Sequence, residues 1–180
     1  APEFAETAPP PTAGVEEPDP GLEAVGHSQA SHAATALLSV GAERLVCSPL
    51  RRARETAAPI AAALGLSVEV SEAMSEIFDP SLGHDSRVAM LGPLLSGKWS
   101  EQPANLRLFR DSVLRTLIEL GDRHTIVVSH FVAISAAIGA ATGDDRVSPC
   151  PLVNASITTM EVVDSKLVLR RKVEVAHLPR

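Results

Sequence analysis

The sequence has few aromatic residues and few cysteines. Aromatic residues make up 3% of the 180 residues, and tyrosine does not occur. Stacking surfaces for nucleobases or sugars are therefore scarce. The two cysteines, Cys47 and Cys150, cannot form a disulfide framework and lack metal-ligand spacing. We interpret them as reduced, buried thiols of a cytoplasmic protein.

Long apolar runs and an excess of positive charge are also absent. No apolar run approaches the roughly 20 residues of a membrane-spanning helix, and the first residues lack the basic-then-apolar order of a signal peptide. The 16 Lys and Arg are outnumbered by 22 Asp and Glu, which gives a net charge of −6. This charge disfavours nucleic acid and membrane as partners. Binding of a small substrate and assembly into a homo-oligomer are both compatible with this composition.

What is present is typical of one folded domain. Apolar residues make up 45% of the chain and charged residues 21%, close to the average for globular proteins. Residues 1–18 are rich in proline and lack apolar periodicity, so we predict an extended arm there. Residues 19–180 form the predicted domain, because 180 residues suffice for one core and not for two ordinary ones.

Helical and strand-like patterns alternate along this domain. Apolar residues recur at helical spacing over residues 22–38, 49–64, 88–95, 106–120 and 131–141. Runs that favour strands cover residues 44–47, 67–70, 125–129, 155–163 and 166–175, the last two joined as a hairpin at Asp164-Ser165. The order predicts a three-layer α/β/α fold with a mostly parallel sheet and an antiparallel part. We expect the continuous apolar run at 125–129 to be central in that sheet.

Arginines crowd the predicted start of the second helix. Arg51, Arg52 and Arg54 follow Ser48-Pro49, which we interpret as the N-cap and first turn. Cations are unfavourable beside the partial positive charge of a helix N-terminus unless an anion joins them. A phosphate group would use both fields. The alternative is that these arginines pair with surface carboxylates or extend into solvent.

A histidine follows the most strand-like segment. His130 comes directly after Ser129, at the end of the sheet where ligands gather in α/β folds. His27 and His32 do not share a tight ligand face, and neither His84 nor His177 completes a metal triad. We therefore predict no metal site and no cofactor.

Four segments resemble the histidine phosphatase superfamily, which includes the cofactor-dependent phosphoglycerate mutases. They are DPGLEAVGHSQA at 19–30, SPLRRARETAAPIAAALGL at 48–66, SEIFDP at 75–80 and TIVVSHFVAI at 125–134. The resemblance implies a phosphoglycerate mutase-like fold and a phosphohistidine mechanism. It implies that Arg52 clamps the phosphate, that His130 hydrogen-bonds the transferring phosphoryl group, and that Glu76 protonates the leaving oxygen. Glu72 and Asp79 are nearby alternatives for that acid.

One part of the family pattern is missing. The family begins with a strand that ends in Arg-His-Gly, whose histidine is the nucleophile, and residues 1–18 contain neither arginine nor histidine. Arg123-His124 precedes its strand and would lie at the wrong edge of the sheet. Phe131 also stands where the family commonly has glycine, which suggests a narrower pocket. We expect the nucleophile to lie outside these 180 residues; the alternative is a nucleophile-free binding or regulatory relative.

The reaction expected from the resemblance is hydrolysis of a small phosphomonoester. Segment 81–105 is short and carries few cations, whereas a mutase must hold a doubly charged phosphoglycerate while it reorients. We therefore favour a phosphatase over a phosphoglycerate mutase-type phosphotransferase, which stays the alternative. The sequence does not identify the phosphorylated substrate.

Overall fold

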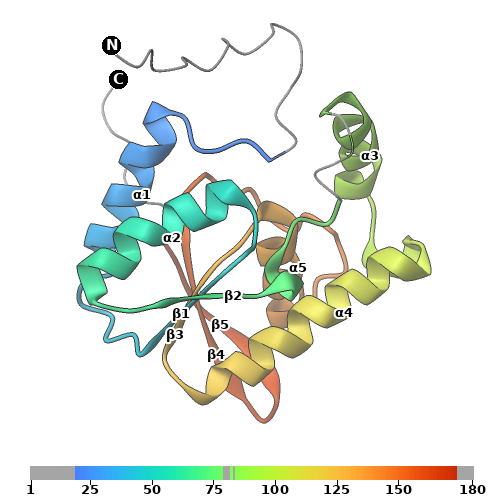
Figure 1. Ribbon diagram of the computed structural model, residues 1–180. Helices are drawn as coiled ribbons and strands as arrows, with labels where there is room; N and C mark the ends of the chain where they lie inside the picture. The colour runs from blue at the N-terminus through green and yellow to red at the C-terminus, as the bar shows by residue number, and fades with distance from the viewer. Residues whose placement is uncertain (1–18, 79–81, 83, 174–180) are drawn as a thin grey trace, which may run out of the picture.

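A computed structural model describes residues 19–78, 82 and 84–173 (Figure 1). The predicted arm at 1–18 lies outside these residues, as do Asp79, His177 and the last two residues of the predicted hairpin. The strands are β1 (Arg44–Cys47), β2 (Val68–Val70), β3 (Thr125–Val128), β4 (Ile157–Val163) and β5 (Lys166–Val173). The helices are α1 (Ala24–Ala36), α2 (Arg51–Leu64), α3 (His84–Ser96), α4 (Ala104–Glu119) and α5 (Phe131–Thr142), with single 3-10 turns η1 (Glu72–Met74), η2 (Trp99–Glu101) and η3 (Leu120–Asp122).

The central sheet lies between two helical layers, as the sequence predicts. Its strands are parallel and run in the order β2-β1-β3. In Figure 1, α1 and α2 cover one side of this sheet, and α4 and α5 cover the other. The fold is therefore a three-layer α/β/α arrangement.

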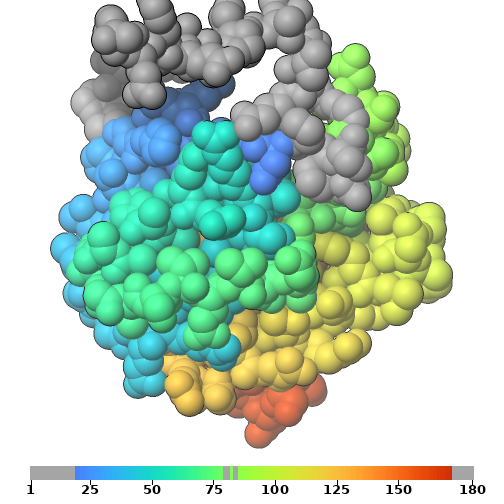
Figure 2. Space-filling view, in the orientation of Figure 1, coloured from blue at the N-terminus to red at the C-terminus, as the bar shows by residue number. Residues whose placement is uncertain are grey.

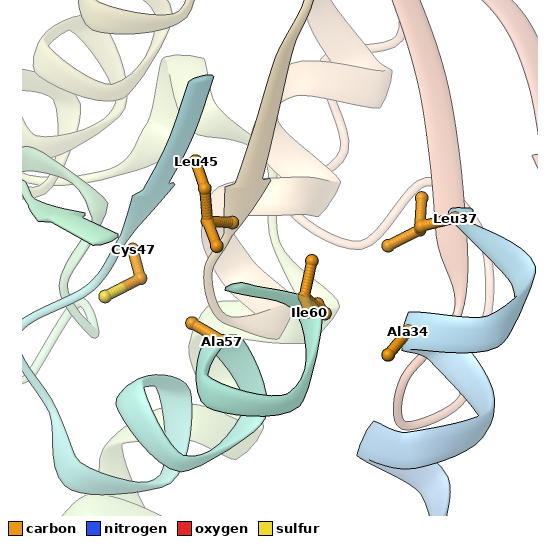
Figure 3. Close-up of a cluster of buried hydrophobic side chains, with 6 residues drawn as sticks. All are labelled: Ala34, Leu37, Leu45, Cys47, Ala57 and Ile60. Atoms are coloured by element: carbon orange, nitrogen blue, oxygen red, sulfur yellow. The ribbon is translucent and has the colours of Figure 1, made fainter. Parts of the chain in front are cut away.

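Alternating side chains of β1 join the sheet to both layers. Leu45 and Cys47 pack with Ala57 and Ile60 of α2 and with side chains of α1 (Figure 3). Val46, between them, packs on the opposite face in a cluster that includes residues of α4 and α5. These three of the four residues of β1 are at most 2% exposed, because a strand's side chains alternate between two covered faces.

The position predicted for the most apolar strand is wrong. β1 is the middle strand, and β3 pairs only with β1 among the described residues. A continuous apolar run predicts that both faces of a strand are buried. It does not predict how many neighbouring strands pair with its edges. The hairpin β4–β5 also forms a separate two-stranded sheet in this part of the chain, whereas we expected it to extend the parallel sheet.

Two predicted helix starts also differ from the structure. α2 begins at Arg51, with Leu50 as its N-cap, and Ser48 does not cap it. Instead the carboxylate of Asp19, Oδ2, accepts the backbone N–H of Arg51 at 2.9 Å. The sequence Asp19-Pro20 resembles a start signal for the first helix, but α1 begins at Ala24. A cap contributed from 32 residues away leaves no local pattern that a sequence reading can find.

Glycines end two helices as their sequence positions predict. Gly65 after α2 and Gly143 after α5 adopt left-handed backbone angles, with φ of 67° and 71°. Glycine reaches this conformation without steric cost, so it is a common helix stop. None of the helices in the described ranges is long and apolar enough to cross a membrane.

The hairpin is held against the α4 side of the molecule by a close approach at one glycine. Asp164 and Ser165 both have positive φ, the conformation of a two-residue hairpin turn. Behind this turn, a Cβ atom at Gly121, in η3, would overlap the side chain of Val162 in β4. Gly121 therefore lets the backbone after α4 contact the hairpin directly.

We expect Gly121→Ala to lower the free energy of unfolding by about 1–3 kcal/mol, the usual cost of an overpacked contact. Gly92→Ala is the matched control. Its Cβ would meet no atom within 4 Å inside α3, and alanine there should be neutral or stabilising by up to about 1 kcal/mol. Urea unfolding of both variants checks the prediction, and equal effects would contradict the close packing.

Candidate active site

Two neighbouring strands bring the candidate residues to one edge of the sheet. β1 is followed by Ser48 and then by the first turn of α2, which carries Arg52. β3 is followed by Ser129 and by His130, the N-cap of α5. Because β1 and β3 are parallel neighbours, their carboxyl ends place Arg52 and His130 side by side.

His130 is buried and hydrogen-bonded through both ring nitrogens. Its side chain is 5% exposed. Nε2 lies 2.7 Å from the hydroxyl oxygen of Ser48, and Nδ1 lies 3.3 Å from an N–H group of Arg52. A guanidinium can only donate, so Nδ1 accepts and Nε2–H donates to Ser48. The two contacts together select one tautomer and one orientation of the imidazole ring.

Burial, with a smaller contribution from the positive charge of Arg52, lowers the pKa of His130 to about 3. Both causes disfavour the imidazolium form. His130 is therefore neutral near pH 7 in the protein without bound anion. A dianion beside Arg52 would offset that positive charge and raise the pKa again.

Glu76 completes a compact group of ionisable side chains. Its carboxylate oxygen Oε2 accepts a hydrogen bond from Arg52 at 3.1 Å and lies 3.7 Å from Nδ1 of His130. The hydroxyl of Ser129 holds the loop that carries Glu76, because it donates to the carbonyl oxygen of Met74 at 2.8 Å. The three residues predicted from the sequence, Arg52, Glu76 and His130, thus converge on one point.

The remaining two arginines of the cluster are placed differently. Arg51 is exposed and paired with Glu55 four residues along the helix, at 2.8 Å. Arg54 is exposed, and Arg52 alone of the three is hydrogen-bonded to Glu76 and His130 among the described contacts. A second carboxylate, Asp19, lies 3.8 Å from Arg52. The alternative interpretation therefore describes Arg51, which pairs with a carboxylate, and Arg54, which is exposed. Arg52, beside His130, is also paired with carboxylates, those of Glu76 and Asp19.

Other candidates from the sequence lie away from this group. Glu72 is exposed in η1, and Asp79 is outside the described residues. His124 precedes β3 and His130 follows it, so these histidines lie at opposite ends of the strand, as predicted. His27 and His32 are exposed on α1. In the described part of the chain, no three His, Cys, Asp or Glu side chains gather as metal ligands.

Sequence reasoning missed two residues of the site, Ser48 and Asp19. Ser48 is fully buried and accepts from both His130 and the backbone N–H of Leu50. Ser48 directly follows β1, just as Ser129 and His130 follow β3. This shared position after a strand could have identified Ser48 as a site residue from the sequence. Asp19 had no such signal, because its contacts with α2 cross more than 30 residues of chain.

Comparison with known proteins is consistent with this geometry. The chain matches the family model described as histidine phosphatase superfamily (branch 1) over residues 11–174. A search of curated proteins found no match.

The same architecture occurs in several solved structures. One is the phosphoserine phosphatase of Entamoeba histolytica in complex with 3-phosphoglyceric acid, with 21% identity, a TM-score of 0.69 and coverage of 87% of this chain and 85% of that chain. A second is the α-ribazole phosphatase of Shigella flexneri, with 20% identity, a TM-score of 0.67 and coverage of 88% and 87%. A third is a mycobacterial glucosyl-3-phosphoglycerate phosphatase, with 21% identity, a TM-score of 0.61 and coverage of 84% and 85%. These likenesses establish the fold.

The lowered pKa of His130 should make stability depend on pH. Between about pH 6.5 and 3 the unfolded chain binds a proton at this residue and the folded protein does not. The free energy of unfolding should therefore fall with decreasing pH, at up to about 1.4 kcal/mol per pH unit from this group. His130→Gln should remove this part of the slope. Urea unfolding between pH 5 and 7 tests it, above most carboxyl titrations, and equal slopes would show that His130 is not held neutral.

Proposed function

The chain belongs to branch 1 of the histidine phosphatase superfamily, and on that premise we propose that it hydrolyses small phosphomonoesters. The observation that carries the proposal is the convergence of Arg52, Glu76 and His130, with Glu76 Oε2 within 3.1 and 3.7 Å of the other two side chains. Phosphoryl transfer needs cationic donors on the phosphoryl oxygens and a proton for the leaving oxygen. These three side chains offer both.

Arg52 is the proposed phosphate clamp. Its side chain is 26% exposed, so an anion can reach it from solvent. In the free protein its guanidinium is bonded to Glu76 and lies near Asp19. A phosphate dianion would bind through paired, charge-assisted hydrogen bonds, which a planar guanidinium forms with favourable geometry.

His130 is the proposed donor to the transferring phosphoryl group. In the free protein Nδ1 has no proton, because it accepts from Arg52. When a phosphoryl group arrives, proton uptake at Nδ1 allows this nitrogen to donate, while Nε2–H keeps its bond to Ser48. Ser48 accepts in both states and so preserves the orientation of the ring. Phosphate binding should therefore be coupled to proton uptake.

Glu76 is the proposed general acid. In the first step, a nucleophilic histidine nitrogen forms a bond to phosphorus, and the ester P–O bond breaks with its electron pair on oxygen. Glu76 in its protonated, carboxylic acid form gives that oxygen its proton and becomes a carboxylate, and the alcohol leaves. In the second step water attacks phosphorus, the P–N bond breaks, and the Glu76 carboxylate accepts a proton from the water.

The nucleophile would come from outside these 180 residues. Among the described residues, β3 has a free edge on the side away from β1, and His130 stands at the carboxyl end of this strand. A strand paired with that edge in parallel would end beside His130 and could present a histidine to the bound phosphate. An upstream coding sequence that carries an apolar strand ending in Arg-His would support the enzyme. Its absence would favour a phosphate-binding relative without catalysis.

Binding of phosphate should depend on Arg52 and not on Arg54. Calorimetry with orthovanadate or phosphate on the complete protein tests this, because it measures binding directly. Arg52→Ala should weaken affinity about ten- to hundredfold, the usual value of a hydrogen bond to a charged group. Arg54→Ala should change it by less than about threefold, since an exposed charge is screened by salt. Similar losses in both variants would show that the clamp is assigned to the wrong arginine.

The acid role of Glu76 should depend on the leaving group. In the complete protein, Glu76→Gln should lower turnover of an alkyl phosphate by about 10²–10⁴-fold, because a basic alkoxide needs the proton. Turnover of nitrophenyl phosphate should fall much less, since its phenolate leaves readily. Glu72→Gln, at the exposed neighbouring carboxylate, is the control and should leave both rates unchanged. Equal losses of turnover for both substrates would contradict the acid role and would show that Glu76 only orders its loop.

A further inference from the structure

A cavity of about 440 Å³ is lined in part by Ile77, the residue that directly follows Glu76 of the proposed active site. Its walls come from the loop after η1, from α3, and from the segment that leads into the first turn of α4. The lining residues are Ile77, Phe78, Met90, Pro93, Leu94, Gln102, Pro103, Asn105 and Leu106. In Figure 1, α3 stands above the N-terminal end of α4, and in Figure 2 it projects at the upper right of the same face.

Two segments of the chain connect the lining of the cavity with the residues of the proposed active site. Ile77 and Phe78 directly follow Glu76, whose proton goes to the leaving oxygen in the proposed reaction. Phe131 directly follows His130, and it packs against the hydrophobic cluster that contains Phe78 and Leu94. The alcohol part of a substrate whose ester oxygen lies within reach of Glu76 can therefore extend past Ile77 and Phe78 into the cavity.

In the described part of the chain, the side chains that line the cavity carry no charge. Seven of the nine lining side chains are apolar, and the other two are the amides of Gln102 and Asn105. The described cations of the surrounding elements are not among the lining residues: Arg87 on α3 is half-buried, and Lys98 and Arg107 are exposed. Arg110 lies over the ring of Trp99 and beside Asp111. A second anionic group on the substrate would lose its hydration here without gaining an ionic partner, which is unfavourable.

The two amides add a polar contact at one side of this apolar wall. The amide N–H of Gln102 donates to the carbonyl oxygen of Lys98 at 2.9 Å, which fixes the direction of the side chain. The amide oxygen of Gln102 and the amide group of Asn105 can then bond a hydroxyl or amide of the ligand. Pockets of this composition bind mainly through apolar contact and orient the ligand through a few polar groups.

From the position and chemistry of the cavity we infer the substrate class. The substrate is a phosphomonoester of an uncharged alcohol with an apolar body, and that body occupies the cavity between Ile77, Leu94 and Leu106. This inference rests on the proposed function, because Arg52 and Glu76 must hold the phosphate for the alcohol to enter the cavity. It disfavours bisphosphates and phosphorylated acids, which carry a second anion.

Alkylphosphonates test the inference without turnover. Calorimetry on the complete protein would compare methyl-, butyl- and hexylphosphonate, and a phosphonate of hexyl length that ends in a carboxylate. Affinity should rise with chain length, up to about fourfold per buried methylene, and the terminal carboxylate should cancel most of this gain. If methylphosphonate binds and longer chains bind no better, the inference is wrong and the proposed function stands. If none of the phosphonates binds, both fail.

A pair of variants on α3 locates the effect. Met90 lines the cavity and is 45% exposed, whereas Val88 on the same helix is 53% exposed and does not line it. Both positions should tolerate lysine without unfolding. Met90→Lys should weaken hexylphosphonate binding at least about tenfold and improve binding of the carboxylate-ended phosphonate, because a cation now faces the cavity. Val88→Lys should leave the preference unchanged. The same change in both variants, or in neither, would overturn the inference.

Discussion

The hydrogen bond between Ser48 and His130 joins the two strand ends on which the site is built. Ser48 follows β1 and His130 follows β3, so a bond of 2.7 Å between their side chains connects adjacent strands directly. Because Ser48 is fully buried, water cannot replace it as a partner for the imidazole. The orientation of His130, its neutral state and the accepting role of its Nδ1 all follow from this enclosure. Arg52 and Glu76 lie beside the imidazole ring of His130, whose orientation is fixed by its hydrogen bonds.

The charges of the site are balanced before any anion arrives. Arg52 is the only cation hydrogen-bonded to Glu76 among the described residues, and the more distant carboxylate of Asp19 also faces it. These carboxylates hold the guanidinium at the end of the helix where an anion binds best, and Asp19 caps that helix at the same time. A phosphate must compete with Glu76 for Arg52. That competition favours a dianion over weaker acceptors, because each extra charge strengthens the contact.

The molecule divides recognition of its proposed substrate between two surfaces of unlike character. The proposed site at the carboxyl ends of β1 and β3 offers charge and hydrogen bonds to a phosphoryl group, whereas the described residues that line the cavity between α3 and α4 are uncharged. The two surfaces are linked through the chain at Glu76 and Ile77, which are adjacent residues. A charged side chain in the cavity would change the electrostatic potential at Arg52 and His130. With apolar lining residues, that potential is set by the side chains around the phosphoryl group.

Local patterns in the sequence determined the α/β fold class, the bounds of β1 and the hairpin turn at Asp164-Ser165, because each depends on neighbouring residues through side-chain periodicity or turn preference. The arginine cluster and His130 were found from their positions after strands, whereas Glu76 and the choice of Arg52 came from the resemblance to the histidine phosphatase superfamily. Tertiary structure alone decided that β1 is the central strand, that Asp19 caps α2 and that Ser48 orients His130. These features depend on contacts between segments from about 30 to more than 80 residues apart, and such contacts leave no periodic trace in the chain.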